Sequence, residues 1–433
     1  MLDQLWTSIA DAGRELVRKR WSGPRRPDVA DLCRDLLSTR GEASGAALAR
    51  ELVGACRDMG EPERLAFFGL LAAEHGPDPA RVLAAVEAYR RQPSPDLVRH
   101  LRQACESPRH ELFRRMNMAP GGTAAILALR ARLLLLLPKH PALLPVDGDL
   151  HDLLSGWFNP GFLTFALIDW NSAAALLEKL LRYEQVHRIQ ALEDLKRRLA
   201  ADRRCFAFFH PALPDEPLIF VEVALVAGMA DRIRPLIDPE APVADPAAAD
   251  TAIFYSINNC QEGLRGVTLG NFLIKAVAAV LTRELPGLKM FATLSPIPGF
   301  AGWLRQALAD GALGEFERGE LAALDEPDWP EDPEAAERLR LPLLKLCAHY
   351  LVREKRDGRP LDSVARFHLG NGARLERINW LGDPSPKGLA ESLGMLVNYR
   401  YDGASIERNH ESYRHNGEVA VSAAVKSLLP SAG

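Results

Sequence analysis

Polar side chains of the types that transfer protons stand beside rigid turns in the second half of the chain. Ser295 opens the segment Ser-Pro-Ile-Pro-Gly, in which two closely spaced prolines fix the backbone and hold the serine in place. His368 precedes the glycine turn at 370–372, and an imidazole can release a proton near neutral pH. Tyr399 and Tyr401 alternate on one face of an expected strand, so one hydroxyl can point into such a site. These residue types favour acid–base chemistry.

Each of these residues also has a purely structural interpretation. Ser295 would then only end a strand, and the chain has no G-x-S-x-G pattern to support an esterase-type nucleophile. His368 would cap its glycine turn, and the two tyrosines would pack in the core. The residues alone leave these alternatives open.

A second group of residues has the pattern of an anion site. The alternating residues of 251–257 predict a strand, glycines follow at positions 263, 266 and 270, and apolar residues then recur at helical spacing until Pro286. A strand, a glycine-containing loop and a helix N-terminus offer unpaired backbone N–H groups, and glycine lets a phosphate approach them. We therefore expect a pyrophosphate ligand. The candidate contacts are Gln261, Gly263, Arg265, Gly266, Val267, Thr268, Leu269, Gly270 and Asn271.

The glycine spacing limits which phosphate compound is expected. It matches neither G-x-G-x-x-G nor the P-loop, so a dinucleotide or nucleoside triphosphate does not follow. An ordinary connection between a strand and a helix is the structural alternative. Arg265, Lys275 and Arg283 could meet phosphates, but Lys275 and Arg283 equally suit a solvated helix face.

The elements that must position these residues fall into two parts. Residues 1–155 are alanine-, leucine- and arginine-rich helical segments separated by glycine or proline, without a cluster of catalytic residue types, and we expect a bundle for oligomerisation or partner contact. Residues 156–433 alternate helices with short strands, which indicates an α+β domain that carries all the candidate chemistry. In this domain we expect a long helix over 172–200, strands over 206–209, 218–226, 251–257, 290–294, 363–367, 374–380 and 396–401, and a closing helix over 417–429.

Length and composition limit the class of protein. The 433 residues suit two domains, and 47% hydrophobic with 25% charged residues is typical of a soluble globular protein. The net charge of −4 argues against a large nucleic-acid interface. The apolar run at 133–137 is far shorter than the ~20 residues of a membrane span. Six scattered cysteines without a C-x-x-C pair favour neither a zinc site nor a disulfide framework, and they fit the reducing cytoplasm.

The glycine loop, the segment SPIPGF at 295–300 and the segment HLGNGA at 368–373 together resemble the malonyl-CoA decarboxylase family. The resemblance covers most of residues 155–401. It implies a helical N-terminal domain followed by a catalytic domain like that of the GNAT acetyltransferases, which hold coenzyme A by a comparable loop. The glycine spacing in 261–266 departs from the usual Gln/Arg-x-x-Gly-x-Gly/Ala of those enzymes, and Thr268 replaces an acidic residue of some relatives.

The resemblance also implies a reaction. Malonyl-CoA would lose CO₂ through a thioester enolate and give acetyl-CoA, with no metal or other cofactor required. Ser295 would bind the carboxylate and accept a proton, His368 would protonate C2, and Tyr401 would be favoured over Tyr399 as the third site residue. The expected partners are the two thioesters and further copies of the chain, without nucleic acid or membrane.

Two other functions are compatible with the same residues. One is acyl transfer from a CoA thioester to an amine or hydroxyl, which CO₂ release from malonyl-CoA alone would distinguish from decarboxylation. The other is a non-enzymatic acyl-CoA-binding scaffold. It would be favoured if replacing Ser295 and His368 by alanine changed no turnover and left ligand binding intact.

Overall fold

A computed structural model of the chain describes residues 28–38, 41–267, 269–312, 319, 321–326 and 328–430. The chain divides into two compact units. The first, here the helical unit, contains the described residues up to Thr164 together with Phe208–Leu218 and Asn259–Leu269. The second, here the sheet unit, contains Phe165–Ala207, Ile219–Asn258 and the described residues from Gly270 onward.

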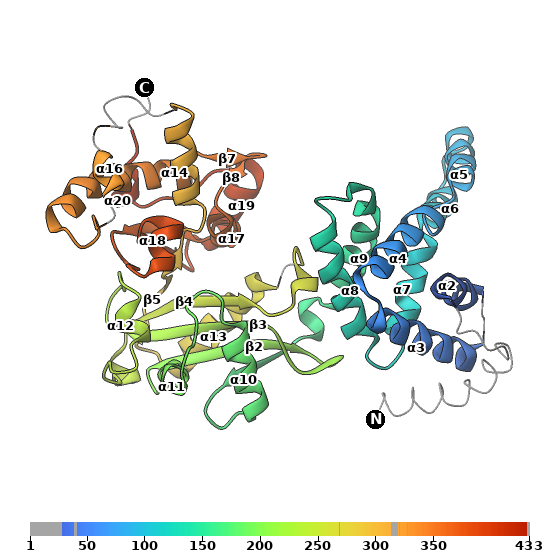
Figure 1. The fold of residues 1–433 in the computed structure, drawn as a ribbon, viewed down its shortest axis with the longest axis horizontal. Helices are drawn as coiled ribbons and strands as arrows, with labels where there is room; N and C mark the ends of the chain where they lie inside the picture. Colours follow the sequence, from blue (N-terminus) through green and yellow to red (C-terminus); the bar gives the residue numbers. More distant parts are fainter. Residues whose placement is uncertain are drawn as a thin grey trace. The chain divides into compact units, whose positions relative to one another are not determined.

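The helical unit is built from helices joined by short connections (Figure 1). Asp78, Ser94 and Ser107 each cap a helix through a side-chain oxygen that accepts from a backbone amide, and each is followed by a proline at the first helical position. The described helices are α2 (Val29–Ser38), α3 (Glu42–Asp58), α4 (Glu61–Glu74), α5 (Pro79–Arg91), α6 (Pro95–Cys105), α7 (Pro108–Asn117), α8 (Gly122–Leu136) and α9 (Leu144–Trp157).

Helix α8 lies at the centre of this unit. It packs against α3, α7 and α9, and also against η4 (Glu262–Leu264), a single 3₁₀ turn of the glycine loop. Its residues are apolar on nearly all sides, which is the pattern of a buried helix. Its two charged residues are Arg132, which is exposed, and Arg130, whose side chain is 2% exposed.

A mixed sheet of eight strands forms the centre of the second part of the chain (Figure 1). Its order is β1-β2-β3-β4-β5-β10-β6, with β9 paired to β10. β4 and β5 are parallel, with Thr251 opposite Met290 and Phe254 opposite Thr293, whereas β10 is antiparallel to β5, β6 and β9. The strands are β1 (Thr164–Ile168), β2 (Arg203–His210), β3 (Leu213–Val226), β4 (Thr251–Asn259), β5 (Met290–Thr293), β6 (Ser295–Pro296), β9 (Arg374–Asn379) and β10 (Leu396–Tyr401).

Helices and short turns connect and cover these strands. They are α10 (Ala174–Tyr183), α11 (Leu192–Arg198), α12 (Arg234–Ile237), α13 (Gly270–Glu284), α14 (Phe300–Ala309), α16 (Pro333–Val352), α17 (Ser363–Gly370), α18 (Pro386–Ser392), α19 (Ile406–Asn416) and α20 (Ala423–Lys426), with the two-stranded ribbon β7 (Lys355–Arg356) and β8 (Arg359–Pro360). Buried residues of four strands, among them Ala224, Ile253, Ala292 and Leu396, form a core with α12. The predicted α+β class, a helical region followed by a mixed sheet, is confirmed. None of the described helices is both long and apolar enough to cross a bilayer.

The prediction of one long helix over 172–200 is wrong. The chain forms α10 and α11 instead, because α10 ends where the buried Glu184 carboxylate accepts from the amides of Val186 and His187, both at 2.8 Å. The same carboxylate accepts from Ser256 of β4 at 2.7 Å. A contact with a distant strand therefore ends the helix, and the local sequence does not signal it.

Two further expectations near the end of the chain are wrong. The strand expected over 363–367 is α17, because Asp362 caps a helix start there. The closing helix expected over 417–429 is reduced to α20, because the residues before it pair with β9, where Leu375 bonds to the backbones of Ala420 and Ser422, and the Ser422 side chain then caps the helix start.

Candidate active site

Ser295, His368 and Tyr401 form one hydrogen-bonded chain inside the sheet unit. The Ser295 hydroxyl lies 3.1 Å from Nε2 of His368, and Nδ1 of the same imidazole lies 2.7 Å from the Tyr401 hydroxyl. The three residues are buried, with exposed fractions of 5%, 3% and 9%. The three catalytic candidates from the sequence therefore lie within hydrogen-bond reach of one another.

Helix α17 and two aromatic rings position His368. The Asp362 side chain caps the helix by accepting from the Ala365 amide at 2.8 Å, and His368 lies in the last turn. The imidazole stacks on Tyr399 with ring centroids 4.7 Å apart, and Phe367 meets it edge-on at 4.9 Å. These contacts fix the plane of the imidazole, so each nitrogen faces a defined partner. Both candidate tyrosines thus contact His368, Tyr401 by a hydrogen bond and Tyr399 by stacking.

Thr293 and Asn398 fix the strand end that carries Ser295. The Ser295 hydroxyl donates to Oγ1 of Thr293 at 2.8 Å, and the same oxygen accepts from the Tyr399 amide at 3.1 Å. Asn398 is fully buried and donates to the Thr293 carbonyl at 2.7 Å. The sequence analysis missed both residues, because neither belongs to a recognisable motif.

Burial sets the protonation states of His368 and Tyr401. Removal from water lowers the pKa of His368 to about 3, because an imidazolium would lose its hydration. Burial also holds the pKa of the Tyr401 phenol well above its usual range. At neutral pH the imidazole is therefore uncharged and the phenol keeps its proton. A neutral imidazole has one donor and one acceptor nitrogen, and donation from Tyr401 to Nδ1 with Nε2–H directed at Ser295 satisfies all three groups.

The three glycines of the loop have different surroundings. A Cβ atom at Gly263 would lie 2.3 Å from the carbonyl oxygen of Leu127 in α8, and one at Gly270 would lie 2.4 Å from the Phe367 ring. Packing of the protein itself therefore requires glycine at 263 and 270. Gly266 is exposed and has a φ of +86°, and the nearest heavy atom to such a Cβ would be Cδ2 of His151, at an ordinary contact distance of 3.6 Å. Gly266 is thus the loop glycine at which a ligand can approach the backbone.

Hydrogen bonds inside the loop limit the donors that it can offer. The amides of Leu264, Arg265 and Val267 each donate to the carbonyl three residues earlier, at 2.9, 3.1 and 2.9 Å. No acceptor among the described residues is paired with the Gly266 amide. Within 261–267, Gly266 therefore combines exposure, a positive φ and an available N–H.

The other loop candidates occupy varied positions. The Gln261 amide group donates to the Pro217 carbonyl at 3.2 Å, and Leu269 is buried. Arg265 pairs with Glu262 at 2.9 Å, and both side chains are more than 60% exposed. Val267 is half-buried. Thr268 and the side chain of Asn271 lie outside the described residues.

Arg130 is a buried contact of the loop that the sequence analysis missed. Its Nη1 donates to the carbonyls of Gly263 at 2.7 Å and Arg265 at 2.9 Å, and its Nε donates to Asp147 at 2.8 Å. A signal was available, because an arginine inside the apolar helix 122–136 has to find partners when it is buried.

The described part of the chain offers neither a metal site nor a reactive thiol beside these residues. The described residues contain no group of three or more histidine, cysteine or carboxylate side chains that could hold a metal ion. Cys33 and Cys56 are buried free thiols, and burial raises their pKa to about 12, so they are poor nucleophiles at neutral pH.

Comparison with known sequences identifies relatives over nearly the whole chain. The malonyl-CoA decarboxylase C-terminal domain matches residues 161–433, and the malonyl-CoA decarboxylase N-terminal domain matches residues 75–158. The mitochondrial malonyl-CoA decarboxylase of Anser anser anser is 37% identical over 405 residues, which cover 84% of this chain and 80% of the relative. That of Rattus norvegicus is 35% identical over 431 residues, which cover 92% and 85%.

Solved structures show the same relationship. Malonyl-CoA decarboxylase from Rhodopseudomonas palustris is 48% identical, with a TM-score of 0.88 over 92% of this chain and 98% of that one. The enzyme from Agrobacterium vitis is also 48% identical, with a TM-score of 0.88 over 93% and 99%. On these similarities in sequence and in fold, the chain belongs to the malonyl-CoA decarboxylase family.

Proposed function

We propose that this chain is a carboxy-lyase that converts malonyl-CoA to acetyl-CoA and CO₂. Membership of the family in both halves of the chain supports the substrate. The observation that supports the proposal is the hydrogen-bonded chain of Ser295, His368 and Tyr401, because decarboxylation needs a hydrogen-bond donor for a carboxylate close to a source of protons.

The thioester carbonyl is the electron acceptor of the reaction. When the bond between C2 and the carboxylate breaks, its electron pair moves into the thioester as an enolate, and CO₂ leaves. The bond breaks most readily when the carboxylate lies out of the carbonyl plane, so the protein has to orient it. Ser295 performs this task by donating its hydroxyl hydrogen to the carboxylate instead of to Thr293, while it accepts from Nε2 of His368.

His368 then delivers the proton. C2 of the enolate takes a hydrogen from Nε2 while the Tyr401 hydroxyl gives one to Nδ1, so the imidazole stays neutral and the negative charge of the enolate passes to the Tyr401 oxygen. Burial disfavours this phenolate as well, so it takes up a proton again before the next cycle. Solvent restores the tyrosine proton at the end of the cycle. One proton is consumed for each CO₂ released, which balances the conversion of a malonyl carboxylate to a methyl group.

The glycine loop binds the pyrophosphate of coenzyme A in this proposal. The Gly266 amide is its exposed donor, and Arg265 can turn from Glu262 to a phosphate because an exposed ion pair contributes only about 0–1 kcal/mol. The reaction requires no metal or organic cofactor, since the thioester itself accepts the electrons.

Incubation with malonyl-CoA as the only substrate tests the proposed function. We expect CO₂ and acetyl-CoA in equal amounts. Turnover that requires an added amine or hydroxyl would instead indicate an acyltransferase. Binding of malonyl-CoA without any turnover would indicate an acyl-CoA-binding scaffold.

We also propose that the chain forms homo-oligomers through the helical unit. Helices α5 and α6 pack against each other, yet Ala104 is the one buried residue of 79–105. Leu83 and Val98 are 65% and 45% exposed. A helical hairpin with so little burial needs a further surface to cover its apolar side chains. Light scattering of a variant that carries Leu83→Lys and Val98→Lys tests this, and an unchanged mass contradicts it. A cytoplasmic location is proposed from the cysteine pattern, although the animal relatives are named as mitochondrial.

A further inference from the structure

We propose that Arg130 is a positioning residue for coenzyme A. Arg130 lies in α8 and holds the glycine loop in the conformation that points the Gly266 amide away from α8. The inference rests on the proposed role of that loop, and it gives the helical unit a part in substrate binding beyond oligomerisation.

Arg130 contacts the loop on the side that faces α8. One guanidinium nitrogen, Nη1, bonds to the carbonyls of both Gly263 and Arg265. Nε bonds to Asp147 of α9, which fixes the guanidinium plane. One helical turn earlier, the Leu127 carbonyl lies against Gly263 so closely that no side chain fits between them. Helix α8 therefore acts as the rigid support on which the loop is shaped.

The geometry of the peptide bond links this support to the ligand side. The carbonyl of Arg265 and the amide of Gly266 belong to one planar trans peptide, so they point in opposite directions. When Arg130 holds the Arg265 carbonyl toward α8, the Gly266 N–H has to point away from α8. The positive φ of Gly266 lets the chain continue from that orientation. Arg130 thus acts on a phosphate through the backbone, without touching it.

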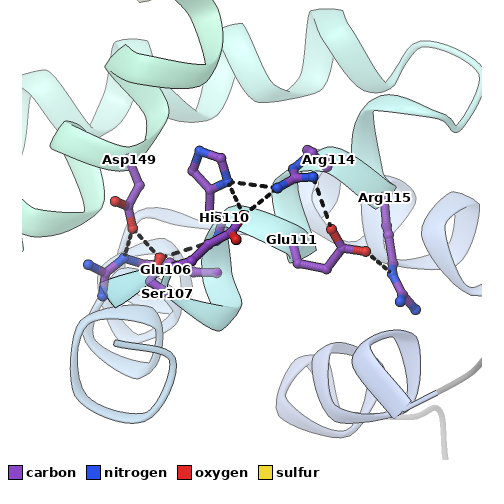
Figure 2. Close-up of polar contacts among 8 residues, drawn as sticks. Glu106, Ser107, His110, Glu111, Arg114, Arg115 and Asp149 are labelled. Carbon is purple, nitrogen blue, oxygen red and sulfur yellow. Dashed lines mark hydrogen bonds and ion pairs between the residues drawn. The ribbon is translucent and has the colours of Figure 1, made fainter. Parts of the chain in front are cut away.

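A second buried arginine in the helical unit provides a matched control. Arg109 is 4% exposed, its Nε donates to Asp149 at 2.6 Å, and its other nitrogens donate to the carbonyls of Leu71 and Pro145 at 3.2 and 3.3 Å. Figure 2 shows Asp149 beside Ser107, which bonds to the same carboxylate. Like Arg130, Arg109 bonds to one aspartate and two backbone carbonyls, but these carbonyls belong to α4 and α9 and not to the loop.

The experiment compares Arg130→Lys with Arg109→Lys in the full-length chain. Lysine keeps the charge but cannot hold two carbonyls and a carboxylate in one plane. For Arg130→Lys we expect KM for malonyl-CoA to rise about tenfold or more, with kcat within about twofold of wild type. Arg109→Lys should leave both parameters within about twofold, even if both variants unfold at a lower temperature.

Malonyl-pantetheine, which lacks the nucleotide phosphates, separates positioning from general destabilisation. Wild type and Arg130→Lys should have the same KM for this truncated substrate. An equal KM increase with both substrates, or an equal increase in both lysine variants, overturns the proposal. Titration with coenzyme A itself keeps the test independent of the reaction. If wild type releases no CO₂, the proposed function fails, whereas tenfold weaker binding of coenzyme A by Arg130→Lys still supports Arg130 and unchanged binding overturns it.

If a lysine variant does not fold, Asp147→Asn replaces Arg130→Lys as the test variant, and Asp149→Asn replaces Arg109→Lys as its control. Asparagine keeps an oxygen that can accept from the arginine Nε, so each fold is disturbed less. Asp147→Asn should show the same increase in KM for malonyl-CoA alone, to a smaller extent. The absence of any difference from Asp149→Asn contradicts the inference.

Discussion

The hydrogen-bonded catalytic candidates and the glycine loop are organised in opposite ways. Ser295, His368 and Tyr401 are buried, and side-chain hydrogen bonds hold them together. Gly266 in the loop is exposed and carries no side chain, and hydrogen bonds to the loop backbone, among them the one from Arg130 to the Arg265 carbonyl, determine its orientation. Burial suits proton transfer because it keeps the imidazole neutral, whereas exposure suits binding of phosphates that remain partly hydrated. The first region therefore depends on the identity of its side chains, and the second on backbone geometry.

Removal of the Ser295 hydroxyl should have one of the largest effects on the buried region. For Ser295→Ala we expect kcat to fall about 10²–10⁴-fold, because the hydroxyl contacts the carboxylate that leaves. Binding of malonyl-CoA should weaken relative to acetyl-CoA, which lacks that carboxylate. Calorimetry with both thioesters and an assay of CO₂ release measure the two effects. Ser427→Ala, at an exposed serine, should change neither. An equal loss of affinity for both thioesters would place Ser295 outside the carboxylate site.

The two tyrosines give a finer test of the same region. Tyr401→Phe removes the hydroxyl that faces Nδ1 of His368, and we expect kcat to fall about 10²-fold. Tyr399→Phe keeps the ring that stacks on His368, and its hydroxyl has no hydrogen-bond partner among the described residues, so kcat should stay within about twofold. The two kcat values at saturating malonyl-CoA decide the matter. Similar losses in both variants would remove the relay through Tyr401.

A side chain at Gly266 should affect the exposed region alone. Gly266→Val opposes a φ of +86° and covers the amide, so we expect KM for malonyl-CoA to rise about tenfold while kcat changes little. Gly228→Val is the control, since its φ is +75° and its Cβ would enter open space, and a Cβ at Gly266 would meet the His151 ring only at an ordinary contact distance of 3.6 Å. The control should lose similar stability, on the order of 1–3 kcal/mol, without the change in KM. An unchanged KM in Gly266→Val would show that the loop does not bind the phosphates.

The pH dependence of stability should reveal the buried imidazole with a smaller signal. The folded-state pKa of His368, about 3, lies below its ordinary 6.5, so the unfolded chain takes up a proton that the folded chain refuses as the pH falls from 6.5 toward 3. The free energy of unfolding should therefore decrease by up to about 1.4 kcal/mol per pH unit from this residue. Urea unfolding of wild type and His368→Asn between pH 4 and pH 7 measures the difference. His187, whose pKa burial also lowers to about 3, contributes to both proteins. Parallel stability curves would mean that the pKa of His368 is the same in the folded and the unfolded chain, which contradicts the effect of burial.

Local patterns predicted the parts of the site in which short-range rules hold. Alternation of apolar residues predicted strand β4, and the two prolines after Ser295 marked a rigid strand end. The residue type of His368 and the segment HLGNGA identified it as a candidate, but the strand predicted before it is helix α17. Val364 and Phe367 favour a strand, whereas the Asp362 cap decides for a helix, and the cap was visible in the sequence.

Long-range contacts account for what the sequence did not predict. Glu184 ends α10 through a contact with Ser256 in β4, and Arg130 meets loop carbonyls more than 130 positions away. Neither pairing follows from a local period or motif. Gly263 was expected to admit a phosphate, yet its space is occupied by the backbone of α8. A glycine pattern identifies a close approach without saying what approaches.

Replacement of His368 by asparagine tests most directly whether binding and chemistry are separate. The measurements are CO₂ release at saturating malonyl-CoA and the affinity for malonyl-CoA by calorimetry, on the same preparation. We expect kcat to fall about 10²–10⁴-fold while the affinity stays within a few fold, because the imidazole is needed after C–C cleavage begins and the phosphates are bound elsewhere. A variant that binds malonyl-CoA poorly but turns over at the wild-type rate when saturated would contradict the role of His368 as proton donor.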